Sequence, residues 1–222
     1  MDRRVTLTFD NGPAAGTIEA ALEALARHDA TATFFVVGRD LARPGVRALV
    51  EATARAGHRV GNHTLTHTLL LGDVTDEATL EREIEEAQEL LGELGAARLF
   101  RPYGGGGILG PHLLSAPAVQ HLGAGGYTCV LWNCVPRDWE QPSRWVETAL
   151  ADIATRDWSV VVLHDAERDA MRHLPRFLDE LRARGVELVA DYPDSCVPIR
   201  RGVVQGSLDG IMASEGGCTN GA

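Results

Sequence analysis

The sequence contains no lysine, and all of its 21 basic residues are arginine. A lysine is required for Schiff-base catalysis and for the phosphate-binding loop of nucleotide hydrolases. This absence therefore excludes a catalytic lysine and a P-loop site. Cysteine is scarce as well, and the four cysteines form no CxxC pair. We expect them to be reduced thiols and not metal ligands.

Long apolar runs and an excess of positive charge are also absent. No run of about 18 apolar residues occurs, so we expect no membrane-spanning helix and no membrane partner. The formal net charge is −10, which speaks against nucleic acid as a partner because phosphate binding needs a basic surface. The first residues form no apolar signal-peptide core, and on this basis we expect a cytoplasmic location.

Short apolar runs alternate with longer segments of helical periodicity. In residues 76–94, for example, Leu80, Ile84 and Leu91 recur at helical spacing with charged residues between them. This alternation predicts βα units and a parallel sheet. The expected strands are residues 3–9, 31–37, 58–61, 98–101, 127–132, 159–163 and 186–190. The expected helices are residues 17–28, 46–56, 76–94, 111–122, 143–155 and 169–184.

About seven βα units are too few for the standard barrel of eight. We therefore expect an α/β fold, a distorted, incomplete (β/α) barrel with about seven parallel strands. An open doubly wound sheet is the alternative. No linker or repeat divides residues 1–195, which we expect to form one domain. The periodicity stops near residue 191, and we expect residues 196–222 to be a poorly ordered C-terminal extension, rich in glycine and serine.

Reactive side chains follow five of the expected strands at the point where each strand ends. In parallel α/β folds these points share one face of the sheet or barrel, so distant segments can line one pocket. The residues are Asp10, Asn11, His63, His67, Arg101, Tyr103, Asp138, Trp139, His164 and Asp165. The remaining histidines lie in or beside helices without such neighbours, and we expect them to be bystanders: His28, His58, His112, His121 and His173.

The spacing of His63 and His67 suits a metal site. Histidines four residues apart on one helical turn can reach the same ion. Such pairs also occur without metal, and the turn at Asp10 and Asn11 has a purely structural reading too. The glycines at residues 104–107 either let backbone N–H groups approach a substrate oxygen or form a flexible loop.

Taken together, the segments TFDNGP, HTLTH, FRPYG, RDW and VLHD resemble, in this order, the five motifs of the polysaccharide deacetylase (NodB-homology) family, carbohydrate esterase family 4. The resemblance covers about residues 5–190. It implies a distorted (β/α) barrel that hydrolyses the N-acetyl groups of chitin oligomers, peptidoglycan or other sugars. It also implies a divalent metal, for which we expect zinc, with cobalt or manganese as alternatives.

The resemblance assigns a role to each matching residue. The catalytic residues would be Asp10 as general base, Arg101 as its partner, His164 as general acid, and Asp138 as a polar group that tunes His164 or the arginine. The metal ligands would be Asn11, His63 and His67. The backbone N–H of Tyr103 would donate to the oxyanion, and Trp139 and Leu163 would form apolar walls around the acetyl methyl group.

The motifs depart from the family pattern at three positions. Asn11 stands where the family usually has an aspartate ligand, so the site loses one negative charge. The segment from Arg101 to Tyr103 is one residue shorter than usual. Val162 replaces the leucine more usual two residues before the acid histidine.

Two other functions stay open. A cyclic imide or ureide amidohydrolase on the same scaffold would agree with the weaker ligand Asn11. A sugar-binding protein without activity would not need Asp10 and His164, which are both present. The sequence leaves the oligomeric state and the identity of the sugar undetermined.

Overall fold

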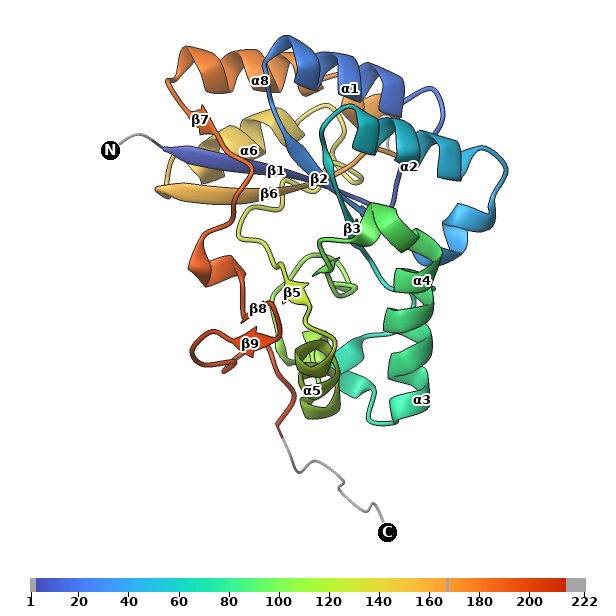
Figure 1. Cartoon of the computed structure of the whole chain (residues 1–222). Coiled ribbons are helices and arrows are strands. Elements are labelled where there is room, and N and C mark those ends of the chain that lie inside the picture. Colours follow the sequence, from blue (N-terminus) through green and yellow to red (C-terminus); the bar gives the residue numbers. More distant parts are fainter. Residues whose placement is uncertain (1–2, 167, 215–222) are drawn as a thin grey trace.

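A computed structural model describes residues 3–166 and 168–214 of the chain (Figure 1). Its centre is a curled, mostly parallel β-sheet with helices around it. The strands are β1 (Arg4–Asp10), β2 (Ala32–Val36), β3 (Arg59–Asn62), β4 (Leu99–Phe100), β5 (Thr128–Cys129), β6 (Trp158–His164), β7 (Glu187–Leu188), β8 (Ile199–Arg200) and β9 (Val203–Val204). Their order is β6-β1-β2-β3-β4-β5-β8-β9, and β7 pairs with β1. The predicted α/β fold, an incomplete (β/α) barrel, is confirmed.

The first seven strands correspond to the seven expected ones, and their pairings with one another are all parallel. Strand β7 lies beside the start of β1, where Arg4 pairs with Glu187. An isolated bridge between Cys134 and Val161 brings the segment after β5 to β6. The sheet thus curls back on itself, and hydrogen bonds of Asn133 and Cys134 to residues of β6 join its two sides there.

We expected the C-terminal extension to be poorly ordered, but its residues 196–214 include two strands and buried side chains. Strand β8 pairs antiparallel with β5 and with β9. The side chains of Val197 and Ile199 are fully buried, and Met212 forms a bridge with Leu114. Burial of this short apolar run holds a segment that is otherwise rich in turn-forming residues. The rest of the extension, including Cys218, lies outside the described residues.

The helices are α1 (Ile18–Arg27), α2 (Val46–Arg55), α3 (Glu77–Leu80), α4 (Ala87–Leu91), α5 (Ala116–Ala124), α6 (Trp145–Ile153), α7 (Arg168–Met171) and α8 (Leu174–Ala183). The single helix expected at residues 76–94 is divided, because a π-helix at Glu81–Glu86 separates α3 from α4. Such π-helical turns often occur at functional sites. Within the described residues, no helix combines the length and apolar character needed to cross a bilayer.

Strand β1 separates an apolar layer from a polar one. Successive side chains of a strand point to opposite faces. Val5, Leu7 and Phe9 accordingly belong to the core cluster that also includes residues of α1, α6 and α8. Thr8 and Asp10 are buried as well, but they face Arg101, with which both form hydrogen bonds. The interior of the barrel therefore carries the polar groups of the candidate site.

Candidate active site

A cavity of about 420 Å³ lies at the carboxyl ends of the parallel strands. Seven of the residues proposed from the sequence line it: Asp10, Asn11, His63, His67, Tyr103, Trp139 and His164. Residues 104–107, Trp132, Val135 and Val162 complete the lining. The fold therefore brings all five motif segments to one cavity. Arg101, Asp138 and Leu163 lie behind the lining.

Arg101 is fully buried beside Asp10. Its Nη1 donates to Asp10 Oδ1 at 2.8 Å and to Thr8 Oγ1 at 2.7 Å. Burial raises the pKa of the Asp10 carboxyl, but the charge and hydrogen bond of Arg101, together with two nearby histidines, outweigh it and lower that pKa below its ordinary value. Asp10 is therefore a carboxylate near neutral pH, held by one oxygen.

Asn11 lies in a sharp turn directly after β1. Its φ of 68° is left-handed, a conformation that asparagine adopts more readily than most residues. A Cβ at Gly12 would lie 1.6 Å from Oδ1 of Asp165, so only glycine fits beside that carboxyl. Asp165 is fully buried, neither of its oxygens has a hydrogen-bond partner among the described residues, and burial raises its pKa to about 7.

The expected helical turn between His63 and His67 is wrong. Thr64 and His67 both have left-handed φ values of 63° and 54°, and the segment is a bend. The two rings nevertheless meet, with centroids 4.6 Å apart. A hydrogen bond from His67 N to Thr64 Oγ1 closes the bend at 3.0 Å. A non-helical loop therefore brings the two imidazoles together, in place of the helical turn that the four-residue spacing predicted.

The π-helix holds this histidine loop. Glu83 is fully buried and accepts hydrogen bonds from the backbone N of Thr66 at 3.0 Å and from its hydroxyl. The backbone oxygen of Glu83 accepts from Leu65 N at 2.8 Å, and that of Ile84 accepts from the side chain of Asn62. Glu83 could not be recognised from the sequence, because only the fold reveals that this member of an acidic helix points inward.

The surroundings of both histidines of the loop favour the neutral imidazole. Nδ1 of His63 lies 2.9 Å from the backbone oxygen of Arg101, which fixes it as the donor nitrogen, and Nε2 lies 3.6 Å from Asp10 Oδ2. Burial lowers the pKa of His63 despite the attraction of Asp10. Burial, and then the neighbouring His63, lower the pKa of His67 to about 3.

Asp138 positions His164 with both carboxylate oxygens. Oδ1 accepts from His164 Nδ1 at 2.9 Å, and Oδ2 accepts from the backbone N of His164 at 2.8 Å. The carboxylate is fully buried. The ring of Trp139 packs edge-on against the imidazole, with centroids 4.7 Å apart. Of the two partners expected for Asp138, the structure places it against His164 and not against Arg101.

Tyr103 and the glycine loop form one wall of the cavity. The Tyr103 ring packs on His67 at 4.3 Å between centroids. Within the described part of the chain its backbone N–H has no hydrogen-bond partner. Trp132 Nε1 donates to the oxygen of Gly107 at 2.8 Å, and a Cβ on Gly104 would lie 2.5 Å from the Trp132 ring. The loop is therefore packed on an aromatic side chain.

Leu163 does not reach the cavity, contrary to expectation. It is fully buried in the cluster beneath the outer helices. Because side chains alternate along β6 and His164 faces the cavity, residue 162 must face the cavity and residue 163 must face away. Val162 accordingly lines the cavity, together with Trp132 and Val135. Trp132 and Val135 were missed because no motif includes them.

The donor set around Asn11 fits a divalent cation. The buried Oδ1 of Asn11 has no hydrogen-bond partner among the described residues. His63 keeps Nε2 for a ligand because Nδ1 is bonded to a backbone carbonyl, which is the usual arrangement behind a ligating histidine. Two neutral imidazoles and an oxygen suit zinc and similar ions.

Comparisons with known proteins agree with these motifs. The family model described as polysaccharide deacetylase matches residues 1–110. A chitooligosaccharide deacetylase from Rhizobium leguminosarum bv. trifolii is 35% identical over 172 residues, which are 74% of this chain and 72% of the relative. A peptidoglycan-N-acetylglucosamine deacetylase from Bacillus cereus is 30% identical over 210 residues, which are 89% of this chain and 73% of the relative.

Other relatives are longer than this chain. The peptidoglycan-N-acetylglucosamine deacetylase PgdA of Listeria monocytogenes is 26% identical over 191 residues, but the chain spans only 38% of its length. Among solved structures, a family 4 carbohydrate esterase from Streptomyces lividans in complex with acetate has a TM-score of 0.71 and 26% identity, covering 89% of this chain and 97% of the other. The catalytic domain of a peptidoglycan N-acetylglucosamine deacetylase from Eubacterium rectale has a TM-score of 0.72 at 22% identity, covers 87% of this chain and 91% of the other, and shares the fold.

Proposed function

The chain belongs to the polysaccharide deacetylase family, and we propose that it is a metal-dependent hydrolase that removes N-acetyl groups from an amino sugar or oligosaccharide. The observation that carries the proposal is one cavity lined by a carboxylate, Asp10, and a carboxylate-held imidazole, His164. The names of the relatives support a substrate of the chitooligosaccharide or peptidoglycan type.

An amide is a difficult substrate because its carbonyl is a weak electrophile and its amine is a poor leaving group. Hydrolysis therefore needs a base for water, an acid for the nitrogen and stabilisation of the oxyanion. Asn11, His63 and His67 would hold a divalent ion, which polarises the carbonyl and lowers the pKa of water when it is bound.

Asp10 is the proposed general base. Arg101 occupies Oδ1, so Oδ2 is the atom that accepts the proton of the attacking water. The lowered pKa of Asp10 keeps it ionised for this step. Burial of the Arg101–Asp10 pair keeps the carboxylate in one orientation.

His164 is the proposed general acid. Asp138 accepts the Nδ1 proton, which makes Nε2 the nitrogen that delivers a proton to the departing amine. The negative charge of Asp138 also stabilises the imidazolium form that donates this proton. Asp138 therefore acts as a positioning residue, since its carboxylate bonds to the ring and to the backbone of His164.

The remaining lining residues would bind the acetyl group. The backbone N–H of Tyr103 donates to the oxyanion, and one such donor contributes roughly 3–4 kcal/mol in comparable sites. Val162, Trp132 and Trp139 supply an apolar surface for the methyl group. The exposed glycine loop at residues 105–106 leaves room for a sugar at the mouth of the cavity.

The test is acetate release from N-acetylglucosamine oligomers and from peptidoglycan fragments. We expect turnover that a chelator abolishes and that added zinc, cobalt or manganese restores, with Asp10→Asn as the inactive control. Full activity without metal on a cyclic imide, and none on these sugars, would favour the alternative amidohydrolase. Sugar binding without acetate release under any metal would favour a binding protein.

A further inference from the structure

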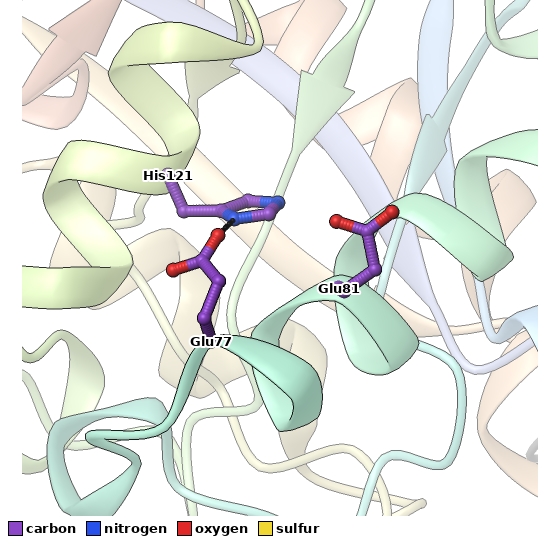
Figure 2. Close-up of side chains that lie close together, drawn as sticks. All are labelled: Glu77, Glu81 and His121. Atoms are coloured by element: carbon purple, nitrogen blue, oxygen red, sulfur yellow. Dashed lines mark hydrogen bonds and ion pairs between the residues drawn. The ribbon is translucent and has the colours of Figure 1, made fainter.

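A second group of side chains suited to metal binding lies away from the cavity. Glu77, Glu81 and His121 come together from α3, the π-helix and α5 (Figure 2). Carboxylate oxygens of the two glutamates and a ring nitrogen of His121 all lie within 4.8 Å of one another. None of the three lines the candidate active site. From the sequence, His121 was expected to be a bystander.

The two ring nitrogens of His121 have different surroundings. The side chain is only 8% exposed, and Nδ1 lies 2.7 Å from Glu77 Oε1. Nε2 is buried and has no hydrogen-bond partner among the described residues, while Glu85 Oε1 lies 3.4 Å from it. Figure 2 shows the Glu81 carboxylate beyond that same edge of the ring. A neutral imidazole that donates its one N–H to a carboxylate can offer the lone pair of its other nitrogen to a metal ion.

The charge around this nitrogen is also suitable. A surface cavity of about 560 Å³ is lined by Glu77, Glu81, Glu85, Arg98 and His121, among others. Of the charged groups in this lining, three are carboxylates and one is a guanidinium, that of Arg98. Its Nη2 lies 3.1 Å from Glu85 Oε2. With a neutral His121, two negative charges among the described residues of this lining are therefore left without a compensating cation, which matches one divalent ion.

We propose that Nε2 of His121 and the carboxylates around it bind a divalent transition-metal ion. One imidazole with carboxylate oxygens is a donor set that zinc and similar ions accept. Glu77 and Glu81 are exposed, so their side chains are free to close around an ion that enters from solvent. Glu77 holds the ring through Nδ1, and Glu81 reaches the ion from the π-helix.

The position of this site gives the ion a structural role. It joins α5 to the π-helix, and the same π-helix holds the histidine loop of the cavity through Glu83. A bound ion therefore fixes the segment on which that loop rests. The proposal does not depend on the deacetylase activity, because it concerns ligands outside the cavity.

The test compares zinc binding by the full chain and three variants, by equilibrium dialysis with metal analysis. His121→Gln removes the nitrogen ligand, and Glu81→Gln removes one charge at an exposed position. Glu86→Gln is the matched control, because Glu86 is an exposed glutamate of the same π-helix. We expect His121→Gln to bind one equivalent less than the unmodified chain and Glu86→Gln, and Glu81→Gln to bind the extra ion at least about tenfold more weakly.

A difference in stoichiometry is informative whether or not the cavity also binds zinc. Zinc should raise the thermal midpoint of the unmodified chain and of Glu86→Gln by at least about 3 °C more than that of His121→Gln. Equal stoichiometry and affinity in all four proteins would overturn the proposal and leave an ion-paired cluster without metal. If His121→Gln fails to fold, Glu81→Gln decides the matter.

Discussion

Asp10 and His164 are register partners at the carboxyl ends of two adjacent parallel strands, β1 and β6. Both side chains line the same cavity. The proposed base and acid are therefore placed by strand pairing, and each is held by its own buried partner. This arrangement favours two separate proton transfers over a shared proton. Arg101 keeps Asp10 ionised, and Asp138 accepts the hydrogen bond from Nδ1 of His164.

We expect Asp10→Asn and His164→Ala each to reduce the rate of acetate release by about 100-fold or more, as is usual when a general base or acid is lost. His164→Ala should retain its metal, because the proposed ligands are other residues. Steady-state kinetics and metal analysis of the same preparations check both points. Loss of the metal in His164→Ala would show that this histidine is a ligand and that its assigned role is wrong.

The alternation of side chains along β6 predicts different effects of substitutions at two neighbouring positions. Val162→Ala should enlarge the acyl pocket and raise the kcat/KM for N-propionyl relative to N-acetyl substrates, because Val162 lines the cavity. Leu163→Ala should leave that ratio unchanged but lower the free energy of unfolding by about 2–5 kcal/mol, the usual cost of a core truncation. Kinetics with both substrates and urea unfolding separate the two. A changed acyl preference in Leu163→Ala would contradict the outward direction of the Leu163 side chain.

Much of this fold could be predicted from the sequence, because apolar periodicity reports which face of each element is buried. All seven parallel strands were expected within a few residues, although β4, β5 and β7 are shorter. The antiparallel strands β8 and β9 could not be expected, since they are two residues each and lie among turn-forming residues. Burial of Val197 and Ile199 holds β8 in place. This burial depends on residues that are far away in the sequence.

The site could be predicted only as far as its motifs extend. Residues at strand ends converge because the fold requires it, so Asp10, His63 and His164 line one cavity, as the sequence predicts. Leu163 was misplaced because the wall was assigned from the family motif and not from strand alternation. Glu83 and Trp132 were missed because their function depends on which way an ordinary glutamate and tryptophan point after folding.

The buried contact of Glu83 predicts a link between stability and the histidine loop. Glu83→Ala should lower the free energy of unfolding by about 1–3 kcal/mol, because the partly buried N–H of Thr66 loses its partner. It should also weaken metal binding in the cavity, since the loop between the two histidines loosens. Urea unfolding and zinc titration test this, with the exposed Glu86→Ala as control. Unfolding and binding that match the control would show that the loop is held by its backbone contacts alone.

Asp165 predicts a pH dependence of stability. Its pKa is raised to about 7 by burial, against about 3.9 in an unfolded chain. Between these values the folded state binds more protons, so this residue lowers the free energy of unfolding as the pH rises from about 4 to 7. Asp165→Asn lacks this effect, and its stability relative to the unmodified chain should improve by a few kcal/mol between pH 5 and pH 8, where about 1.4 kcal/mol corresponds to one pKa unit. Urea unfolding at both pH values, with a chelator present throughout, measures the difference; a difference independent of pH would mean that Asp165 is ionised in the folded protein.

Asn11 predicts a metal site of reduced affinity. Two neutral imidazoles and a neutral amide provide no charge to compensate a divalent ion, and such ions bind anionic oxygen better than amide oxygen. Asn11→Asp should therefore tighten metal binding in the cavity by at least about tenfold, or about 1.4 kcal/mol. The change is nearly isosteric, and aspartate also tolerates the left-handed φ of this position. The free energy of unfolding should therefore hardly change.

The effect of Asn11→Asp on the rate is a separate question, because a second carboxylate beside Asp10 raises the pKa of that base. The acidic limb of the pH–rate profile should then move towards higher pH, while the affinity for zinc increases. Zinc titration is best done in the His121→Gln background, so that the second proposed site does not contribute. Unchanged affinity in that background would mean that the Asn11 side chain does not ligate the ion, and that Asp10 or another group is the third ligand beside His63 and His67.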